Sequence, residues 1–536
     1  MVFALCAAVL ALFCSRKTGM FIDEVYSFGL SNSAAGPYFS DLRQEGLEDQ
    51  LFTAEDIEEY LTVEEGSGPD LAAVYRNQSL DVHPPLYYWL LNLASSLFPG
   101  SCSVNIGTGL NALIFALTLL AFYFLVKYLY GSRDIACCGV VLFGTSVLAI
   151  SMVMMIRMYT LMTLFTVLLA AVTAHIIRNP GKGILYPLLT LVVFCGVMSQ
   201  YYFAFYAFFL CSFYDVYALV KKRYRSLVCF SLCALLGIGL LVLVFPACLK
   251  QLFVGNGQVV GGSSVGEALK NTSLYGEKIS AFWSATEKTK ALNLILPLGI
   301  AVVILAVLAG KIRCRRTGST SLLSAANSAA DSLLLSLPVV PAFLTVAVIS
   351  PVLEHRYIYN LLPGAVLFVC FVLSLSLKYA GKLFSPADCA GYIPGKTLVC
   401  FCAVVSLWFA KSMPPDNLYV ERQEFDALVS AHADSPCVYI TDGYFAPVTQ
   451  DMLQLSLFNS FFTTSDPESE KMQSYVGDAD EAVLYIDTNA YWSSGYDPGE
   501  VIKSFSAATG LTESSLLYSF TYEGVDGLSS AYLMTR

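Results

Sequence analysis

The sequence predicts an all-α polytopic membrane protein with a small α/β domain at its C-terminal end. Two observations predict the membrane part: the 536 residues are 56% hydrophobic and 13% charged, and the mean hydropathy is +0.62. A third observation sets the C-terminal end of the chain apart, because long apolar runs recur up to residue 411 and the remaining segment contains only a short helical pattern and short strand-like stretches. This combination is typical of a helix bundle in lipid with a water-soluble appendage.

The first apolar run, residues 1–14, has no basic segment before it and no small-x-small cleavage site before Arg16 and Lys17. We therefore interpret it as a spanning helix and not as a cleaved signal peptide. Together with the later runs it predicts about eleven passages through the membrane. The later apolar runs cover roughly 104–130, 135–152, 160–177, 184–199, 203–220, 226–246, 290–310, 332–351, 358–377 and 397–411.

Basic residues indicate how these passages are oriented. They fall in alternate loops, for example Arg178 with Lys182 and the run Lys221–Arg225, and the positive-inside rule puts such loops in the cytoplasm. The N-terminus is then cytoplasmic, whereas the C-terminal domain and the first loop, residues 15–85, are extracytoplasmic. We expect a multi-pass protein of the plasma membrane, and the absence of eukaryotic retention signals favours a bacterial one.

Two domains follow from this topology. Residues 1–411 form the transmembrane catalytic domain, with its functional motif in the loop 15–85, and residues 412–536 form a soluble α/β domain. Within the second domain the pattern predicts a helix over 421–432, strands at 437–440 and 482–486, and a hairpin around Glu523-Gly524. In the first loop, Thr53-Ala54-Glu55-Asp56 predicts a capped helix start.

Charged and aromatic residues that suit catalysis all fall on the outer side of this topology. An acidic pair beside a membrane is costly unless it faces water or a reaction. A carboxylate can remove a proton from a hydroxyl group, and a guanidinium can hold a leaving phosphate through two hydrogen bonds. The segments concerned are Asp23-Glu24, His83-Pro84-Pro85, Arg157-Met158-Tyr159 and Arg356-Tyr357.

The order of these segments resembles the motifs of the GT-C membrane glycosyltransferases. The most similar branch contains the protein O-mannosyltransferases and the bacterial aminoarabinose transferase of lipid A. The resemblance rests on an acidic pair after the first helix, a large loop that ends in His-Pro-Pro, and an Arg-x-Tyr at the outer end of a later passage. It covers about residues 1–380 and leaves out the C-terminal domain.

The resemblance implies an enzyme that moves a sugar from a polyprenyl-phosphate donor to a protein, lipid or cell-wall acceptor on the extracytoplasmic face, with inversion at the anomeric carbon. It implies that Asp23 is the catalytic base and that Glu24 orients the acceptor or a metal ion. Residues implied to bind the donor phosphate or to support its loop are His83, Arg157, Tyr159, Arg356 and Tyr357. At the position of His83 the aminoarabinose transferase has a Lys.

A divalent metal ion stays open as a cofactor. Hard oxygen and imidazole ligands are available from Asp23, Glu24, Asp81 and His83, but no spacing rule joins them into one site. No other cofactor and no nucleic-acid partner is indicated.

Structural interpretations stand beside the catalytic ones. Asp23 could cap a short helix, His83 could be a turn residue, and helix-end arginines often extend towards lipid headgroups. For the whole chain the alternatives are a transporter or flippase of lipid-linked sugars, and a sensor or adhesion protein. A transporter places ionisable groups near the bilayer midplane. The predicted passages are nearly free of charge at their centres, which favours the transferase.

Overall fold

A computed structural model describes residues 1–253, 276–280, 331–350, 354–383, 395–443, 445–489, 495–520 and 528–536. The chain divides into two compact units. The helical unit comprises Met1–Cys14, Val82–Tyr87 and Asn111–Asp416, and the sheet unit comprises Ser15–Asp81, Tyr88–Leu110 and Asn417–Arg536. This division differs from the predicted one at 411/412, because most of the first loop belongs with the C-terminal segment and not with the membrane helices.

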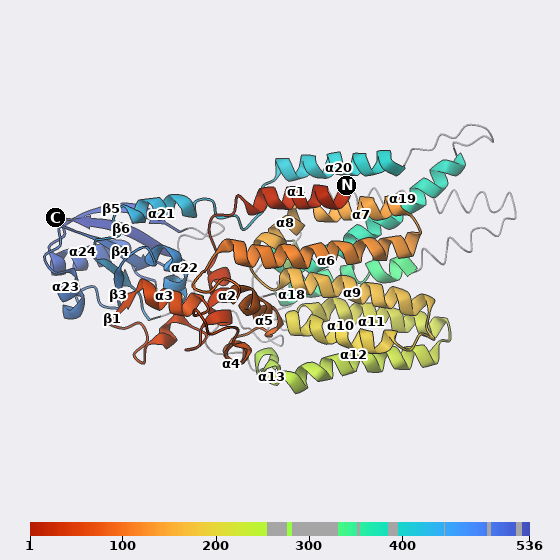
Figure 1. Cartoon of the computed structure of the whole chain (residues 1–536), viewed down its shortest axis with the longest axis horizontal. Coiled ribbons are helices and arrows are strands. Elements are labelled where there is room, and N and C mark those ends of the chain that lie inside the picture. The colour runs from red at the N-terminus through yellow and green to blue at the C-terminus, as the bar shows by residue number, and fades with distance from the viewer. Residues whose placement is uncertain are drawn as a thin grey trace. The chain divides into compact units, whose positions relative to one another are not determined.

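The longest helices of the helical unit run side by side (Figure 1). Helix α10 packs against both α9 and α12, and α7 packs against α19 and α20. Within the described ranges its helices include α1 (Val2–Cys14), α6 (Val104–Tyr130, of which the part from Asn111 belongs to this unit), α7 (Arg133–Gly144), α8 (Val147–Met154), α9 (Tyr159–Arg178), α10 (Leu185–Ser199), α11 (Phe203–Val220), α12 (Tyr224–Val244), α13 (Ala247–Phe253), α18 (Val339–Ile349), the 3-10 helix η4 (His355–Leu361), α19 (Leu362–Leu383) and α20 (Gly395–Ser412).

Six of the described helices are long and apolar enough to cross a membrane, or seven if α7 and α8 form one bent span. Helices α1 and α10 are also apolar but have only 13 and 15 residues. The described part of the chain therefore accounts for fewer passages than the predicted eleven or so. The predicted run 290–310 lies outside the described residues.

The outer face of α6 supports contact with lipid. Its large side chains Leu113, Leu117, Leu120 and Phe124 recur at intervals of three or four residues and are all exposed. Side chains on the opposite face, such as Phe122, are buried. Because a stripe of exposed large apolar residues is unfavourable in water, this arrangement fits a helix with one face in protein and the other in hydrocarbon.

The predicted passage at 135–152 is two helices and not one. Helices α7 and α8 meet at an angle of 56°. The hydroxyl of Ser146 accepts the backbone N–H of Ala149 at 3.3 Å and so caps the start of α8. A serine that caps a new helix ends the preceding one, which a window of hydropathy does not detect.

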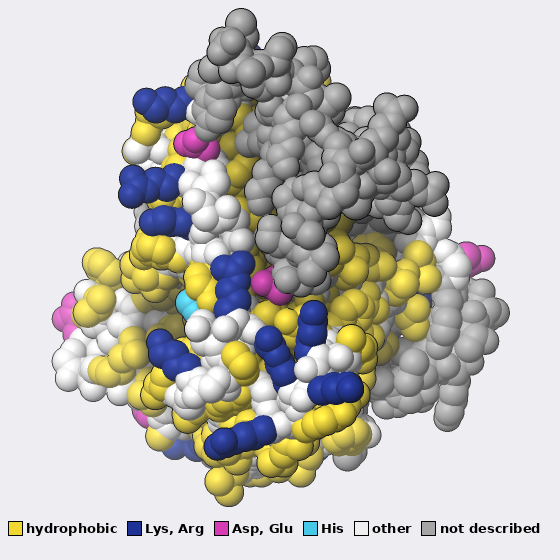
Figure 2. Space-filling model, turned by 90° about the vertical axis from the view of Figure 1, so that its right-hand side faces the viewer, with side chains coloured by type: hydrophobic (Ala, Val, Ile, Leu, Met, Phe, Trp, Pro, Cys, Tyr) yellow, Lys and Arg dark blue, Asp and Glu magenta, His cyan; other side chains and the backbone are white. Residues whose placement is uncertain are grey.

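Basic residues gather at one end of the helices in this unit (Figure 2). Arg178, in the last turn of α9, donates to the carbonyl oxygens of Tyr128 and Leu129 near the end of α6. Arg223, which precedes α12, donates to the carbonyl of Ile177 at 2.6 Å. The loops that contain Arg178 and Arg223, two of those predicted to share one side, therefore lie together. The predicted basic run 311–316 lies outside the described residues.

The sheet unit contains a six-stranded sheet with the strand order β1-β3-β2-β4-β6-β5. Strand β2 pairs in parallel with β3 and β4, and β6 pairs antiparallel with β4 and β5. The predicted strands at 437–440 and 482–486 and the predicted C-terminal hairpin pairing are confirmed. The elements are β2 (Cys437–Ile440), β3 (Ser460–Thr464), β4 (Glu481–Asp487), β5 (Glu513–Ser519), β6 (Ser529–Thr535), α21 (Arg422–Ser430), α22 (Phe445–Leu455), α23 (Glu470–Val476) and α24 (Pro498–Thr509).

The first loop supplies the remaining strand of this sheet. Strand β1 (Gln50–Thr53) pairs antiparallel with β3, with Gln50 opposite Thr463. Figure 1 shows β1, in red, at the edge of the blue sheet. The predicted capped start follows directly, because Thr53 and Asp56 accept each other's backbone N–H groups at the start of α3 (Ala54–Leu61).

Amide side chains tie the rest of the first loop to the C-terminal end of α2 (Ile22–Asn32). Asn77, on α4 (Leu71–Leu80), donates to the carbonyl of Ser33 at 2.9 Å. Asn92, on α5 (Leu86–Ser95), donates to the carbonyl of Ser31 at the same distance. Because the last carbonyls of a helix have no intrahelical partners, these amides satisfy the end of α2 and fix it in the unit.

Candidate functional site

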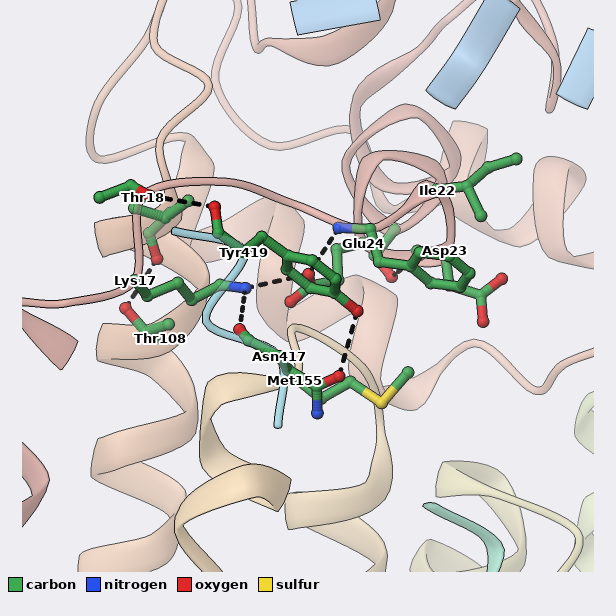
Figure 3. Close-up of polar contacts among 12 residues, drawn as sticks. Lys17, Thr18, Ile22, Asp23, Glu24, Thr108, Met155, Asn417 and Tyr419 are labelled. Carbon is green, nitrogen blue, oxygen red and sulfur yellow. Dashed lines mark hydrogen bonds and ion pairs between the residues drawn. The ribbon is translucent and has the colours of Figure 1, made fainter. Parts of the chain in front are cut away.

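Asp23 lies in the first turn of α2, and its side chain is half-buried. Phe21 precedes the helix in an extended conformation. Figure 3 shows the carboxylate of Asp23 pointing away from the cluster formed by Lys17, Glu24 and Asn417. The N-terminal end of a helix dipole favours a negative charge, so the first turn of α2 suits an ionised carboxylate.

Glu24 has a different environment from its neighbour. Its Oε2 atom accepts the Nζ of Lys17 at 3.0 Å, and both side chains are completely buried. The same oxygen accepts the backbone N–H of Phe21 at 2.8 Å, and Lys17 also donates to the carbonyl of Asn417 at 2.8 Å. The structure therefore gives Glu24, predicted to orient the acceptor or a metal, an internal partner with which it holds the start of α2.

One of the four metal candidates, Glu24, is already paired with a cation. Glu24 already faces the ammonium of Lys17, and a second cation would be repelled there. Asp23, Glu24 and Asp81 belong to the sheet unit and His83 to the helical unit. Within the described ranges, no three His, Cys, Asp or Glu side chains are grouped so that they could hold a metal ion.

The segment that contains His83 is tied to the segment that contains Arg157. His83 itself is half-buried and is followed by two buried prolines. The hydroxyl of the buried Tyr87 donates to Oδ1 of Asn111 at 3.1 Å. The Nδ2 of Asn111 donates to the carbonyls of Val153 at 3.1 Å and Met155 at 2.6 Å. Asn111 thus joins two predicted motif segments within the helical unit.

Aromatic rings bring the later motif residues together. Arg157 is buried, with 5% of its surface exposed, and lies between α8 and α9. Tyr159, the first residue of α9, packs edge-on against Tyr357 and Tyr359 with ring centroids 6.3 and 6.0 Å apart. Tyr202 stacks on Tyr357 at 4.8 Å. The predicted residues Tyr159 and Tyr357 are therefore neighbours in the structure.

Arg356 lies beside this aromatic group. Its guanidinium is 5.4 Å from the ring centroid of Tyr357. Its Nη2 donates to Oε1 of Glu354 at 2.8 Å, and Nε also pairs with the Glu354 carboxylate. Both side chains are mostly buried, so the guanidinium of Arg356 lies next to Tyr357 in a site with little water, with its charge compensated by Glu354.

Sequence reasoning missed several residues that organise these sites. Asn111 was hidden inside an apolar run, and Glu354 is two residues from Arg356 but was given no role. A buried amide within an apolar helix is a usable signal, because it must find hydrogen-bond partners. Lys17 looked like an ordinary residue at the end of the first helix, and no local pattern predicts its partner.

Comparison with known proteins identified no matching family model and no matching curated protein. One similar solved structure is the crystal structure of ArnT from Cupriavidus metallidurans bound to undecaprenyl phosphate. The two are 11% identical, with 99% of this chain and 97% of that chain covered and a TM-score of 0.47. Another is the archaeal oligosaccharyltransferase AglB from Archaeoglobus fulgidus, in complex with an inhibitory peptide and a dolichol-phosphate. Its identity is 10%, with 93% of this chain and 72% of that chain covered and a TM-score of 0.40.

Proposed function

We propose that this chain is an integral-membrane glycosyltransferase. It moves a sugar from a polyprenyl-phosphate donor to an acceptor on the extracytoplasmic face of the plasma membrane. The observation that carries the proposal is the convergence of separate motif segments in the helical unit. Tyr159 and Tyr357 are in contact, Arg356 lies over Tyr357, and Asn111 ties the segment after His83 to the backbone just before Arg157.

The positive charges of this site suit the leaving group. Arg356 and Arg157 would bind the phosphate of the donor, which carries the negative charge that develops as the bond to the sugar breaks. Tyr159 and Tyr357 would support the phosphate or the donor lipid near it. Glu354 accepts one hydrogen bond from Nη2 of Arg356 and forms an ion pair with its Nε, and so fixes the direction of the planar guanidinium.

Asp23 supplies the base in this proposal. Its carboxylate takes the proton from a hydroxyl or amine of the acceptor, whose oxygen or nitrogen attacks the anomeric carbon. The bond between that carbon and the phosphate oxygen breaks, and polyprenyl phosphate leaves with the electron pair. A single in-line displacement inverts the anomeric carbon. The orientation of Asp23 away from the Lys17–Glu24 pair supports this assignment (Figure 3).

The test is transfer by the purified protein from a panel of radiolabelled polyprenyl-phosphate sugars, comparing wild type with Asp23→Asn. We expect transfer to fall by about 10²–10⁴-fold, while binding of the donor is unchanged, because the phosphate-binding residues remain. Glu55→Gln is the matched control: Glu55 is an exposed carboxylate in the first turn of another helix of the same unit. It should leave transfer at the wild-type rate.

Two results would contradict the proposal. Full activity in Asp23→Asn would remove the proposed base. Absence of transfer from every donor by the wild type, with movement of the labelled lipid between the leaflets of a vesicle, would favour the transporter instead.

A further inference from the structure

The chain just before Asp23 lies along the start of the C-terminal segment. The backbone N–H of Thr18 donates to the carbonyl of Leu418 at 3.1 Å, and its hydroxyl donates to the carbonyl of Tyr419 at 3.0 Å. The ring of Phe21 stacks on that of Tyr419 with centroids 6.0 Å apart. Residues that are 401 positions apart in the sequence therefore form one local structure in the sheet unit.

The first turn of α2 is capped by a side chain from the same C-terminal segment. The backbone N–H of Ile22, the residue before Asp23, donates to Oε1 of Gln450 at 3.2 Å in a buried position. The first N–H groups of a helix have no intrahelical acceptor and need one from elsewhere. Gln450, on α22, is 428 positions away in the sequence and provides it.

Arg422 holds the segment that carries Gln450. The guanidinium of Arg422 is 2% exposed and donates to the carbonyl of Gln450 at 3.3 Å and to Oε1 of Gln454 at 3.2 Å. It also lies 4.0 Å from the ring centroid of Phe520. Three separate contacts therefore fix this one side chain against α22 and the sheet.

Asp451 connects Arg422 to the core of the sheet. Its Oδ1 is 3.7 Å from Nη1 of Arg422, and it accepts the hydroxyls of Tyr439 at 3.0 Å and Tyr518 at 3.2 Å. Burial raises the pKa of Asp451, and the nearby Arg422 opposes that shift. The contacts that hold the segment of Gln450 thus extend through Asp451 to strands β2 and β5.

Gly19 shows how closely the motif segment approaches this anchor. A Cβ atom at Gly19 would lie 2.3 Å from Cγ of Arg422 and 3.1 Å from the carbonyl oxygen of Tyr419. Only glycine leaves room for such an approach. The path of the chain into α2 is consequently fixed by the buried position of Arg422.

We propose that Gln450, held in place by Arg422 and Asp451, is a positioning residue that fixes the first turn of α2 and hence the carboxylate of Asp23. The inference rests on the proposed function, since the position of Asp23 affects turnover only if Asp23 acts as the base. It makes the C-terminal segment a working part of the transferase and not a separate appendage.

The test uses the full-length protein with Gln450→Ala. We expect kcat to fall by about tenfold or more, because a small misplacement of a catalytic group is costly, while the KM for the donor stays within about twofold. Amide hydrogen exchange at residues 21–25 should become faster, whereas exchange in β2 should not change. The comparison of exchange at residues 21–25 with exchange in β2 distinguishes a local displacement of the start of α2 from a general loss of stability.

Matched variants sharpen this test. Gln450→Glu retains an oxygen that can accept the N–H of Ile22, and it should restore both kcat and slow exchange. Arg422→Lys keeps the charge beside Asp451 but loses the planar fork, so it should change both quantities in the same direction as Gln450→Ala. Arg536→Ala, which removes an exposed ion pair with Asp480 in the same unit, should change neither.

Two outcomes would overturn the inference: unchanged kcat and unchanged exchange in Gln450→Ala, or faster exchange at residues 21–25 with unchanged kcat. Failure of the proposed function gives a different result. In that case Asp23→Asn keeps full activity, while the exchange of residues 21–25 still reports whether Gln450 anchors the helix.

Discussion

The two units hold their motif segments by different physical means. In the sheet unit a fully buried ion pair, Lys17–Glu24, fixes the start of α2 with the help of the carbonyl of Asn417, 400 positions away. In the helical unit the motif segments are held by a neutral amide, Asn111, and by a group of packed tyrosine rings. The ion pair Arg356–Glu354 of this unit joins residues only two positions apart. The start of α2 in the sheet unit therefore depends on a buried ion pair, whereas the motif segments of the helical unit are held mainly by a neutral amide and by aromatic packing.

The largest expected effect comes from breaking the buried pair. Glu24→Gln leaves the ammonium of Lys17 buried without its counter-ion, which should lower the free energy of unfolding by about 3–5 kcal/mol. The measurement is thermal and urea unfolding in detergent. The double variant Lys17→Met/Glu24→Leu should recover most of the loss, because it removes both charges.

The exposed pair Arg536–Asp480 is the control for this prediction. Arg536→Ala should cost less than about 1 kcal/mol. If Glu24→Gln costs no more than Arg536→Ala, the buried ion pair does not stabilise the sheet unit, and the contrast between the units is lost.

An intermediate effect is expected at Asn111. Asn111→Leu leaves the carbonyls of Val153 and Met155 without their amide donor, which should cost about 1–3 kcal/mol. The KM for the donor should rise, because the backbone just before Arg157 loses its anchor. Since the amide is neutral, the loss should be the same in low and high salt.

Asn179→Ala, at an exposed position after α9, is the control and should leave stability and KM at their wild-type values. A wild-type KM in Asn111→Leu would separate the fold of this region from donor binding.

The smallest effect is expected at Glu481 in the sheet unit, which is partly exposed and pairs with His432. Hydrogen bonds from Ser435 and His432 lower the pKa of Glu481 from its ordinary value of 4.5. Because the folded-state pKa is depressed, the stabilisation is complete above the unfolded-state value and is lost as pH falls through the folded-state value. Glu481→Gln should therefore be less stable than wild type at pH 7 by under about 1 kcal/mol.

Unfolding of wild type and Glu481→Gln at a series of pH values checks this prediction. The two curves should approach each other as pH falls below the usual range for Glu. If the two stability curves separate further in acid, folding raises the pKa of Glu481 and does not lower it.

The membrane helices were largely predictable from the sequence, because hydropathy reports a property that each helix carries by itself. The predicted runs 104–130 and 203–220 coincide with α6 and α11. The sequence did not predict the break within 135–152, where the cap formed by Ser146 divides one apolar run into two helices. A polar cap inside an apolar run changes the average hydropathy little but changes the path of the chain.

The motif residues were predictable in part. Tyr159, Arg356 and Tyr357 stand out in short turns between apolar runs, and the structure brings them together. The partners of Lys17 and Ile22 in the C-terminal segment were not predictable, because Asn417 and Gln450 belong to no pattern shared with them. Contacts between residues hundreds of positions apart are set by the tertiary fold, and a single sequence contains no periodic signal for them.

The pairing of β1 with β3 has a consequence for biosynthesis. Thr53 faces Ser460 across the sheet, so β1 emerges from the ribosome long before its partner exists. At ~5–20 residues per second, the interval is about 20–80 s. During that time the helical unit is synthesised, and β1 has no partner strand. An unpaired strand edge can pair with a wrong strand. We expect nascent chains that end before residue 460 to expose the first loop to protease, and complete chains to protect it.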